Sequence, residues 1–228
     1  MKIIGINAFH ADSSACIIIN GELVTAVEEE RFNRVKHWAG FPIESIKHCL
    51  SETKLKISDI DQISINIDPK ANYIEKFIFL IKHRPSLNLI LNRFKKKKKY
   101  NSINELINNE FKEDKFVGKI NNIEHHYAHL SSAFHVSPFQ EASLLSVDGF
   151  GDFASTAWGY GNNTNISIDK KIFFPHSLGI FYQALTQFLG FKNYGDEYKI
   201  MGLAPYGKPT YVEQLKKILL IKSNGNFE

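Results

Sequence analysis

The sequence predicts a mixed α/β fold made of two related lobes. Three short β-branched runs follow one another at the N-terminus, and the same order of three strands and a helix begins again at residue 142. Composition agrees with this prediction, because a chain of 228 residues with 43% hydrophobic content can bury one large core or two smaller ones.

The first lobe is expected to open with a three-stranded meander. Its strands are predicted near 2–9, 14–20 and 22–29. The dipeptide Asn20-Gly21 is typical of a tight two-residue hairpin. An amphipathic helix is predicted near 42–53, with Pro42 in its first turn, and a short strand follows it.

Residues 68–115 differ in composition and are predicted to form a basic, helical insertion. Much of the net charge of +4 comes from its lysine run, Lys95–Lys99. The favoured interpretation of this run is a solvated helix face or a loop, and the alternative is a patch for an acidic substrate or a nucleic acid. The rest of the chain is close to neutral, which argues against a nucleic-acid-binding stripe.

After the insertion the chain is predicted to begin again. A strand is predicted near 116–123 and a helix near 125–135. A second meander follows, with strands near 142–148, 154–160 and 165–174, and then a further helix near 179–190. A repeated three-strand meander with crossover helices is the pattern of the actin-like ATPase superfamily, whose lobes are ribonuclease H-like and bind nucleotide or phosphate between them. The expected lobes are 1–141 and 142–228, the second of them incomplete.

A cluster of histidines lies on the predicted helix near 125–135. His125 and His129 are four residues apart, so they point about 40° apart on one helix face and could chelate one ion. His126 and His129, about 60° apart, are an alternative pair, whereas His135 lies on a different face. Capping or core packing is the commoner use of such a pair.

The stretch "VDGFGD" supplies the third candidate ligand. Asp148 is expected to end an apolar strand beside a glycine turn, and a carboxylate is the usual partner of two histidines around iron or manganese. Gly149 and Gly151 would let the backbone approach a phosphate closely. The alternative is an ordinary hairpin turn.

Three further segments carry candidate binding residues. The turn "FHADSSA" contains His10, Ser13 and Ser14, whose hydroxyls and nearby amides could hold phosphate oxygens, although such residues are also common in turns. The end of the third strand carries four basic residues, which either bind an anion or form a solvated strand end: Arg31, Arg34, Lys36 and His37. The loop "DEYKIMGLAPYGKP" is shaped by two glycines and a proline and carries Glu197, Lys199 and Gly202.

These motifs together resemble the N-terminal domain of the O-carbamoyltransferases that modify nodulation factors and antibiotics. The resemblance rests on "GINAFHADSSACIIINGELVTAVEEERFNRVKH", "HHYAHLSSAFHVSPF", "VDGFGD" and "GIFYQALTQFLGF…EYKIMGLAPYGKP", in the family's order over most of residues 1–210. It is weakest in 68–115.

The resemblance implies transfer of a carbamoyl group from carbamoyl adenylate to a hydroxyl of a small-molecule acceptor. ATP and carbamoyl phosphate would be co-substrates, and a divalent metal, iron first, would be the cofactor. His125, His129 and Asp148 would be the metal ligands, and His10 and Lys36 would be the catalytic residues. Nucleotide or substrate would contact the set Ser13, Ser14, Gly149, Gly151, Glu197, Lys199 and Gly202.

The family pattern also implies a longer protein. A C-terminal domain that forms carbamoyl adenylate is expected outside this chain, either as a missing half or as a partner chain. In tRNA-modifying relatives of this family, an Asp stands where this chain has Gln183, so their ribose contact is not carried over. A non-catalytic fragment that binds metal or nucleotide is the alternative, followed by an actin-like sugar or acid kinase.

Cysteine usage and hydropathy bear on the compartment. Cys16 and Cys49 are too few for a disulfide framework and fit a reducing compartment. The apolar N-terminus is interrupted by His10 and Asp12, and no stretch has the length of a membrane span. We therefore expect a cytoplasmic protein without a membrane partner.

Overall fold

The structure is a computed structural model, and it describes residues 1–86 and 103–227. The lysine run Lys95–Lys99 lies outside the described residues. The chain divides into two compact units, Met1–His125 and His126–Glu228, and each is described by itself.

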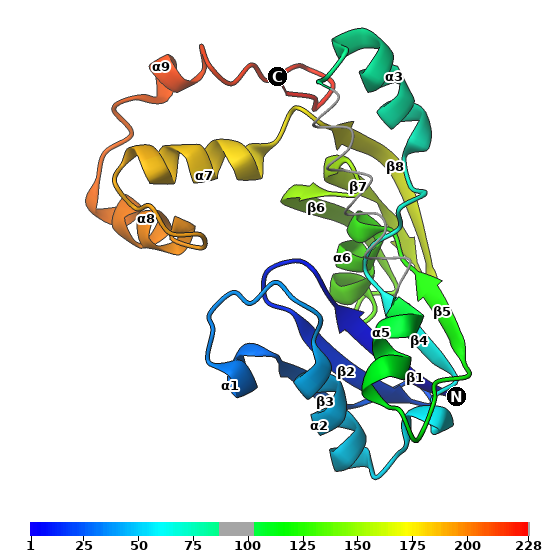
Figure 1. Ribbon diagram of the computed structural model, residues 1–228. Helices are drawn as coiled ribbons and strands as arrows, with labels where there is room; N and C mark the ends of the chain where they lie inside the picture. Colours follow the sequence, from blue (N-terminus) through cyan, green and yellow to red (C-terminus); the bar gives the residue numbers. More distant parts are fainter. Residues whose placement is uncertain (87–102, 228) are drawn as a thin grey trace. The chain divides into compact units, whose positions relative to one another are not determined.

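Unit 1 is built on a five-stranded sheet with the order β3-β2-β1-β4-β5 (Figure 1). Strands β1 to β3 form an antiparallel meander, and β4 and β5 add to it in parallel. The bounds are Lys2–Asn7 (β1), Ser14–Ile19 (β2), Glu22–Glu28 (β3), Gln62–Ile65 (β4) and Lys119–Asn122 (β5). Asn20 and Gly21 both have positive φ, as a type I′ hairpin turn requires, so this predicted turn is confirmed.

Helix α2 (Ile43–Thr53) connects the meander to the parallel strands and packs on β2 and β3. Its residues Ile46, Cys49 and Leu50 join the isoleucines of β1 and β4 in the buried core. Burial of this much branched aliphatic surface is the main stabilising term of the unit. The short helices α1 (Glu30–Asn33) and η1 (Ile57–Asp59) flank α2 along the chain.

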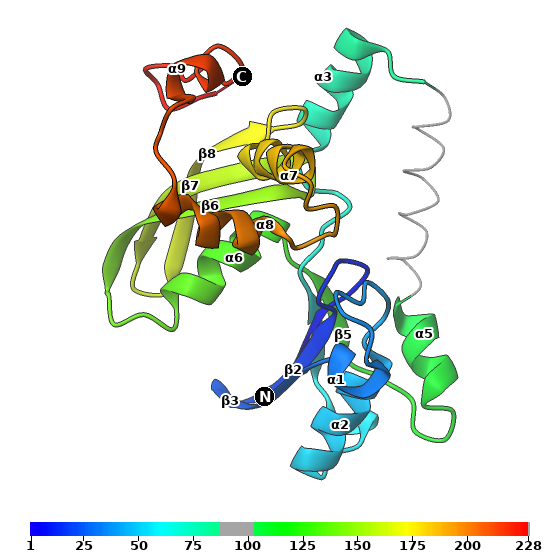
Figure 2. The same cartoon turned by 90° about the vertical axis from the view of Figure 1, so that its left-hand side faces the viewer.

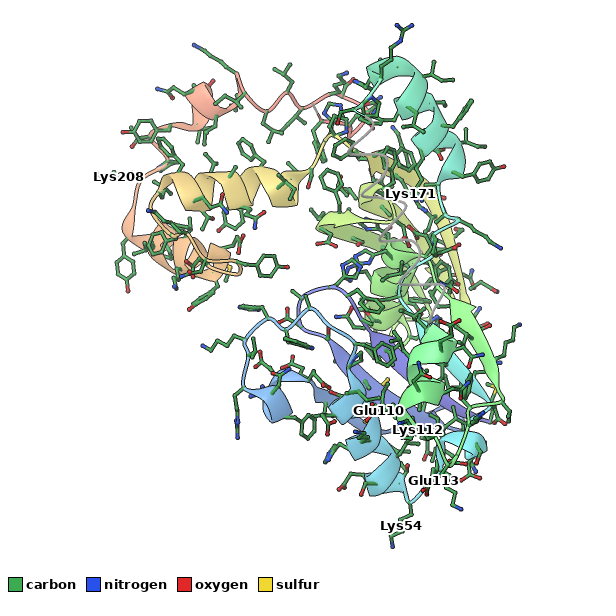
Figure 3. All side chains as sticks on the ribbon, in the orientation of Figure 1. Lys54, Glu110, Lys112, Glu113, Lys171 and Lys208 are labelled. Carbon is green, nitrogen blue, oxygen red and sulfur yellow. The ribbon has the colours of Figure 1, made fainter. Side chains whose placement is uncertain are left out.

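The predicted insertion contributes helices α3 (Tyr73–His83) and α5 (Ile103–Glu110). Ile103 and Ile107 bury one face of α5 in the unit 1 core. Lys47 of α2 forms an ion pair with Glu110, whose side chain Figure 3 labels near the end of α5. Among the described residues, no helix combines the length and the apolar character needed to cross a bilayer.

Unit 2 contains a second antiparallel meander, in the order β6-β7-β8 (Figure 2). The bounds are Glu141–Gly151 (β6), Ala154–Asn162 (β7) and Asn165–Phe173 (β8). The prediction that the first strand ends at Asp148 is wrong, because β6 continues to Gly151. The pairing is interrupted between Val147 and Gly151, so three residues of β6 oppose the single residue Ser155.

The hairpin turn between β6 and β7 is formed by Asp152 and Phe153, which both have positive φ. Gly149 and Gly151 therefore do not make this turn, contrary to the prediction from their residue type. The irregularity at 148–150 is a bulge, and bulges commonly re-aim a side chain beside a functional site. Here it is Asp148 that lies within the bulge.

Two helices pack against this meander. In α6 (His125–Phe134), Leu130 and Phe134 are buried, and a Cβ on Gly161 of β7 would lie only 2.7 Å from Phe134 Cζ. Helix α7 (Leu178–Phe188) contacts β6. Helix α8 (Glu197–Leu203), the turn η2 (Ala204–Tyr206) and α9 (Val212–Leu215) follow.

The fold is therefore the predicted mixed α/β, actin-like type. Unit 1 has the ribonuclease H-like order of an antiparallel meander followed, after a crossover helix, by parallel strands. After helix α6, unit 2 has the same succession of three antiparallel strands and a helix.

Candidate metal centre

Helix α6 and the bulge of β6 bring three metal-binding side chains together. The ligand atoms of His125, His129 and Asp148 all lie within 4.8 Å of one another. The unit boundary falls after His125, which is the first residue of the same helix as His129. His129 Nε2 is 3.5 Å from Asp148 Oδ2. Two imidazoles and a carboxylate at such spacing can converge on a single ion.

His126 does not belong to this cluster. Its side chain is fully buried, and its Nδ1 lies 2.8 Å from Ser146 Oγ, between α6 and β6. The contact fixes the rotation of α6 over the strand, which turns His125 and His129 to the Asp148 side. Helical spacing alone left the pair 126/129 open, and the geometry favours 125/129. His135 is exposed and its ring lies against Phe134.

The tautomer of His125 is set within unit 1. His125 Nδ1 is 3.3 Å from the backbone carbonyl oxygen of Asn66, and a carbonyl only accepts, so Nδ1 carries the proton. The other nitrogen, Nε2, is then the atom able to bind a metal. A backbone carbonyl in this role is a common way to orient a ligating histidine. The side-chain amide of Asn66 in turn donates to Asn7 Oδ1, which ties the ends of β4 and β1 together.

His10 also lies beside His125. Their ring centroids are 5.4 Å apart, at an interplanar angle of 34°. His10 stands in the turn between β1 and β2, where Phe9 and Asp12 have positive φ. The carbonyl oxygen of His10 accepts a hydrogen bond from Ser13 Oγ, which fixes the turn around the imidazole.

The loop that carries Lys36 is tied to this turn. Backbone amides of Phe9 and Ser13 donate to Gly40 and Trp38, and Asp12 Oδ1 lies 2.9 Å from His37 Nδ1. The exposed side chain of Lys36 therefore stands on a loop held against the turn of His10. The Ser13 hydroxyl is buried and also donates to the carbonyl oxygen of Gly40, so its hydrogen bonds hold the turn and the loop together. Ser14 is the first residue of β2.

The remaining predicted residues occupy two places in unit 2. Gly149 and Gly151 lie in and after the β6 bulge, and the amide of Gly149 donates to Asp148 Oδ1 at 2.6 Å. Glu197, Lys199 and Gly202 lie on α8.

Lys199 on α8 forms a 2.6 Å ion pair with Asp196. Their hydrogen bond lowers the pKa of Asp196 and raises the pKa of Lys199. Lys199 Nζ also lies over the rings of Tyr198 and Phe191. The ammonium is thereby held on one side of α8 as a fixed positive charge.

Comparison with known proteins identifies the family. The sequence pattern described as Carbamoyltransferase N-terminus matches residues 2–227. The chain belongs to this family. The earlier resemblance to the N-terminal domain of this family is thus confirmed.

Relatives show how much of the family protein this chain spans. The uncharacterized protein sll1178 of Synechocystis is 36% identical over 99% of this chain and 38% of its own length. The nodulation protein NolNO of Sinorhizobium fredii is 34% identical over 90% of this chain and 29% of its own length. The chain therefore spans about a third of the length of these relatives. Among solved structures, YeaZ from Pseudomonas aeruginosa aligns over 77% of this chain and 68% of its own, with a TM-score of 0.40 and 9% identity.

Several residues that shape the site were missed by sequence reasoning. Ser146, Asn66 and the pair Ser177 and Gly179 each act through contacts between elements distant in sequence. Only Ser177 had a local signal, since a serine directly before an apolar run is a typical N-cap.

Proposed function

We propose that this chain is the carbamoyl-transferring part of an O-carbamoyltransferase, which moves a carbamoyl group from carbamoyl adenylate to a hydroxyl of a small-molecule acceptor. The observation that carries the proposal is the cluster of His125, His129 and Asp148 within a chain of this family. Carbamoyl adenylate would be formed from carbamoyl phosphate and ATP by the rest of the family protein or by a partner chain.

The three clustered residues would hold a divalent ion. Two histidines and one carboxylate suit iron or manganese, and the proton placement on His125 leaves Nε2 for coordination. A bound ion would supply Lewis-acid polarisation of the carbamoyl carbonyl. The donor set therefore fits the cofactor that the family resemblance implies.

The transfer itself forms one bond and breaks another. The acceptor oxygen would attack the carbamoyl carbon, and the bond from that carbon to the bridging phosphate oxygen would break, so that AMP leaves with the electron pair. The acceptor proton must go to a base, for which His10 is the candidate because its ring lies beside His125. Lys36, on the loop tied to the same turn, would offset the charge of the leaving phosphate.

Nucleotide would be held by the remaining candidates. The backbone around Gly149 and Gly151, the turn residue Ser14, and the α8 residues Glu197, Lys199 and Gly202 are the proposed contacts. Ser13, whose hydroxyl is buried and bonded within the turn, would support the turn instead. Of the proposed contacts, Lys199 is the fixed cation that suits a phosphate.

Metal binding is the first test of the proposal. The purified chain, freed of metal and titrated with Fe²⁺ in the absence of oxygen, should bind about one ion. Mutation of a group that only orients a metal ligand typically weakens metal binding by about 10- to 100-fold. His129→Ala and Asp148→Asn remove proposed ligands themselves, so each should weaken binding by at least that factor. His135→Ala is the matched control on the same helix and should bind normally. Equal binding by all four proteins would refute the site.

Carbamoyl transfer is the second test. The chain would be mixed with the C-terminal part of a relative, ATP, labelled carbamoyl phosphate and a panel of hydroxyl acceptors. We expect labelled product and AMP, with a loss of about 10²- to 10⁴-fold in rate for His10→Ala. Phosphorylated acceptor would favour the kinase alternative, and metal binding without any product would favour a non-catalytic module.

A further inference from the structure

The start of helix α7 lies directly against the backbone that carries Asp148. Gly179 is the second residue of α7, and a Cβ placed on it would lie 2.6 Å from Asp148 C and O and 2.7 Å from Gly149 N. Real Cβ atoms do not come this close to other atoms. The obstacle is backbone and cannot rotate away, so only glycine allows α7 to sit where it does.

The same peptide group orients the Asp148 side chain. The amide of Gly149 donates to Asp148 Oδ1 at 2.6 Å, while Oδ2 lies 3.5 Å from His129 Nε2. The backbone beyond Val147 is in the bulge and lacks regular pairing with β7. Contacts other than the sheet must therefore fix the Asp148–Gly149 peptide, and α7 provides them.

Ser177 completes the attachment. Its hydroxyl lies 3.1 Å from Asp148 O and 2.7 Å from Gly149 O, to which it donates. The same oxygen accepts from the amide of Ile180 at 3.1 Å and so caps α7. One side chain thus joins the helix start to two carbonyl groups of the bulge, those of Asp148 and Gly149.

We propose that Gly179 and Ser177 are positioning residues that fix the carboxylate of Asp148 toward His129. This inference rests on the proposed metal centre and concerns what holds one of its ligands. Gly179 provides the close approach and Ser177 provides the hydrogen bonds, and neither would touch the ion. Their effect is on how well Asp148 is aimed before an ion binds.

Gly179→Ala tests the close approach, with Co²⁺ as the probe. Co²⁺ affinity and the visible absorption of the bound ion report ligand geometry, and thermal unfolding reports the fold. Gly179→Ala should bind Co²⁺ about 10- to 100-fold more weakly, with an altered spectrum, as expected for changes in the groups that orient a ligand. Ala184→Gly is the matched control, because it weakens α7 at an exposed position away from Asp148 and should leave affinity and spectrum unchanged.

Ser177 offers a conservative rescue. Ser177→Thr keeps a hydroxyl and should bind Co²⁺ like the natural chain, whereas Ser177→Ala should weaken binding. Amide exchange of Gly149 in the metal-free proteins gives a readout that needs no ion. Exchange should be faster in Gly179→Ala and Ser177→Ala than in Ala184→Gly.

The outcomes separate the two proposals. Failure of the natural chain to bind Co²⁺ or Fe²⁺ would refute the metal centre, while Gly149 exchange would still decide whether α7 holds the peptide. Normal Co²⁺ affinity and normal Gly149 exchange in a folded Gly179→Ala protein would overturn the positioning role. An equal loss of affinity in Ala184→Gly would also overturn it, since the effect would then come from helix stability alone.

Discussion

Asp196 holds the side chain of Lys199, one of the binding residues predicted from the sequence, in place. It is 5% exposed, its Oδ1 lies 2.6 Å from Lys199 Nζ, and its Oδ2 accepts from the amide of Asn193 at 3.0 Å. The sequence pattern pointed to Glu197 and Lys199, but the residue just before them determines where the lysine stands. A charge pair three residues apart on a helix start is too common in sequences to mark a site.

Acid should therefore loosen α8. The hydrogen bond with Lys199 lowers the pKa of Asp196, so the carboxylate stabilises the folded state above the ordinary Asp pKa of about 3.9, and this contribution is lost as pH falls through the lowered value. Amide exchange of residues 197–203, corrected for the intrinsic rate, should accelerate in acid for the natural chain. Asp196→Asn should exchange faster already at neutral pH and respond less to acid.

Asp169→Asn is the control for the acid experiment, since Asp169 is exposed on β8. It should retain the natural pH profile in residues 197–203. If the natural chain and Asp196→Asn give the same profile, the ion pair does not hold α8 in solution.

At the scale of elements, helix α2 is capped by a residue from another element. Pro42 stands at its N-cap and supplies no side-chain hydrogen bond. Instead, the buried carboxylate of Glu29 accepts from the amides of Glu44 and Ser45, at 3.2 and 2.8 Å, and from Ser45 Oγ at 2.7 Å. These amides are among the donors that a helix start leaves unsatisfied. Glu29 thus joins the end of β3 to α2.

Loss of this cap should destabilise unit 1. We expect Glu29→Ala to lower the free energy of unfolding by roughly 2–3 kcal/mol, because charge-assisted hydrogen bonds and a helix cap are lost together. Glu28→Ala, which removes a half-exposed ion pair with Arg31, should cost below about 1 kcal/mol. Chemical denaturation of both variants makes the comparison, and equal costs would contradict the cap.

Local signals predicted the elements better than the contacts between them. Asn20-Gly21 was placed correctly because a type I′ turn depends on its own two residues. The β6–β7 turn was predicted at Gly149 and Gly151 because glycine is common in turns. In the structure these glycines lie in and after the β6 bulge, and the turn is formed by Asp152 and Phe153. The choice between His125 and His126 was open because it depends on the rotation of α6, which the contact with Ser146 sets.

At the scale of the whole molecule, the two meanders have different neighbours. In unit 1, β1 is hydrogen-bonded to β2 on one edge and to the parallel strand β4 on the other. In unit 2, β6 pairs only with β7 within the part of the chain that the structure describes. Leu145 and Val147 of β6 are exposed, at 68% and 49%. An edge of this kind is a template for another strand.

The repeat predicts which strand that would be. In unit 1 the parallel neighbour of the first strand follows the crossover helix α2, so by analogy a strand following α7 in the longer family proteins would pair with β6 in parallel. In an antiparallel edge strand every second residue directs its amide away from its one partner. Those amides of 142–147 should exchange rapidly in this chain by itself, whereas the alternate amides, bonded to β7, should be protected.

Addition of the remaining part of a relative, such as the nodulation protein NolNO, should protect the outward amides of β6. The protection should appear together with any carbamoyl-transfer activity, since the strand that completes the sheet would also stabilise the bulge beside Asp148. The amides of β1, which already has two partners, serve as the internal control and should not change. Full protection of both sets of β6 amides in the chain by itself would contradict the prediction, because the edge would then already be covered without any added segment.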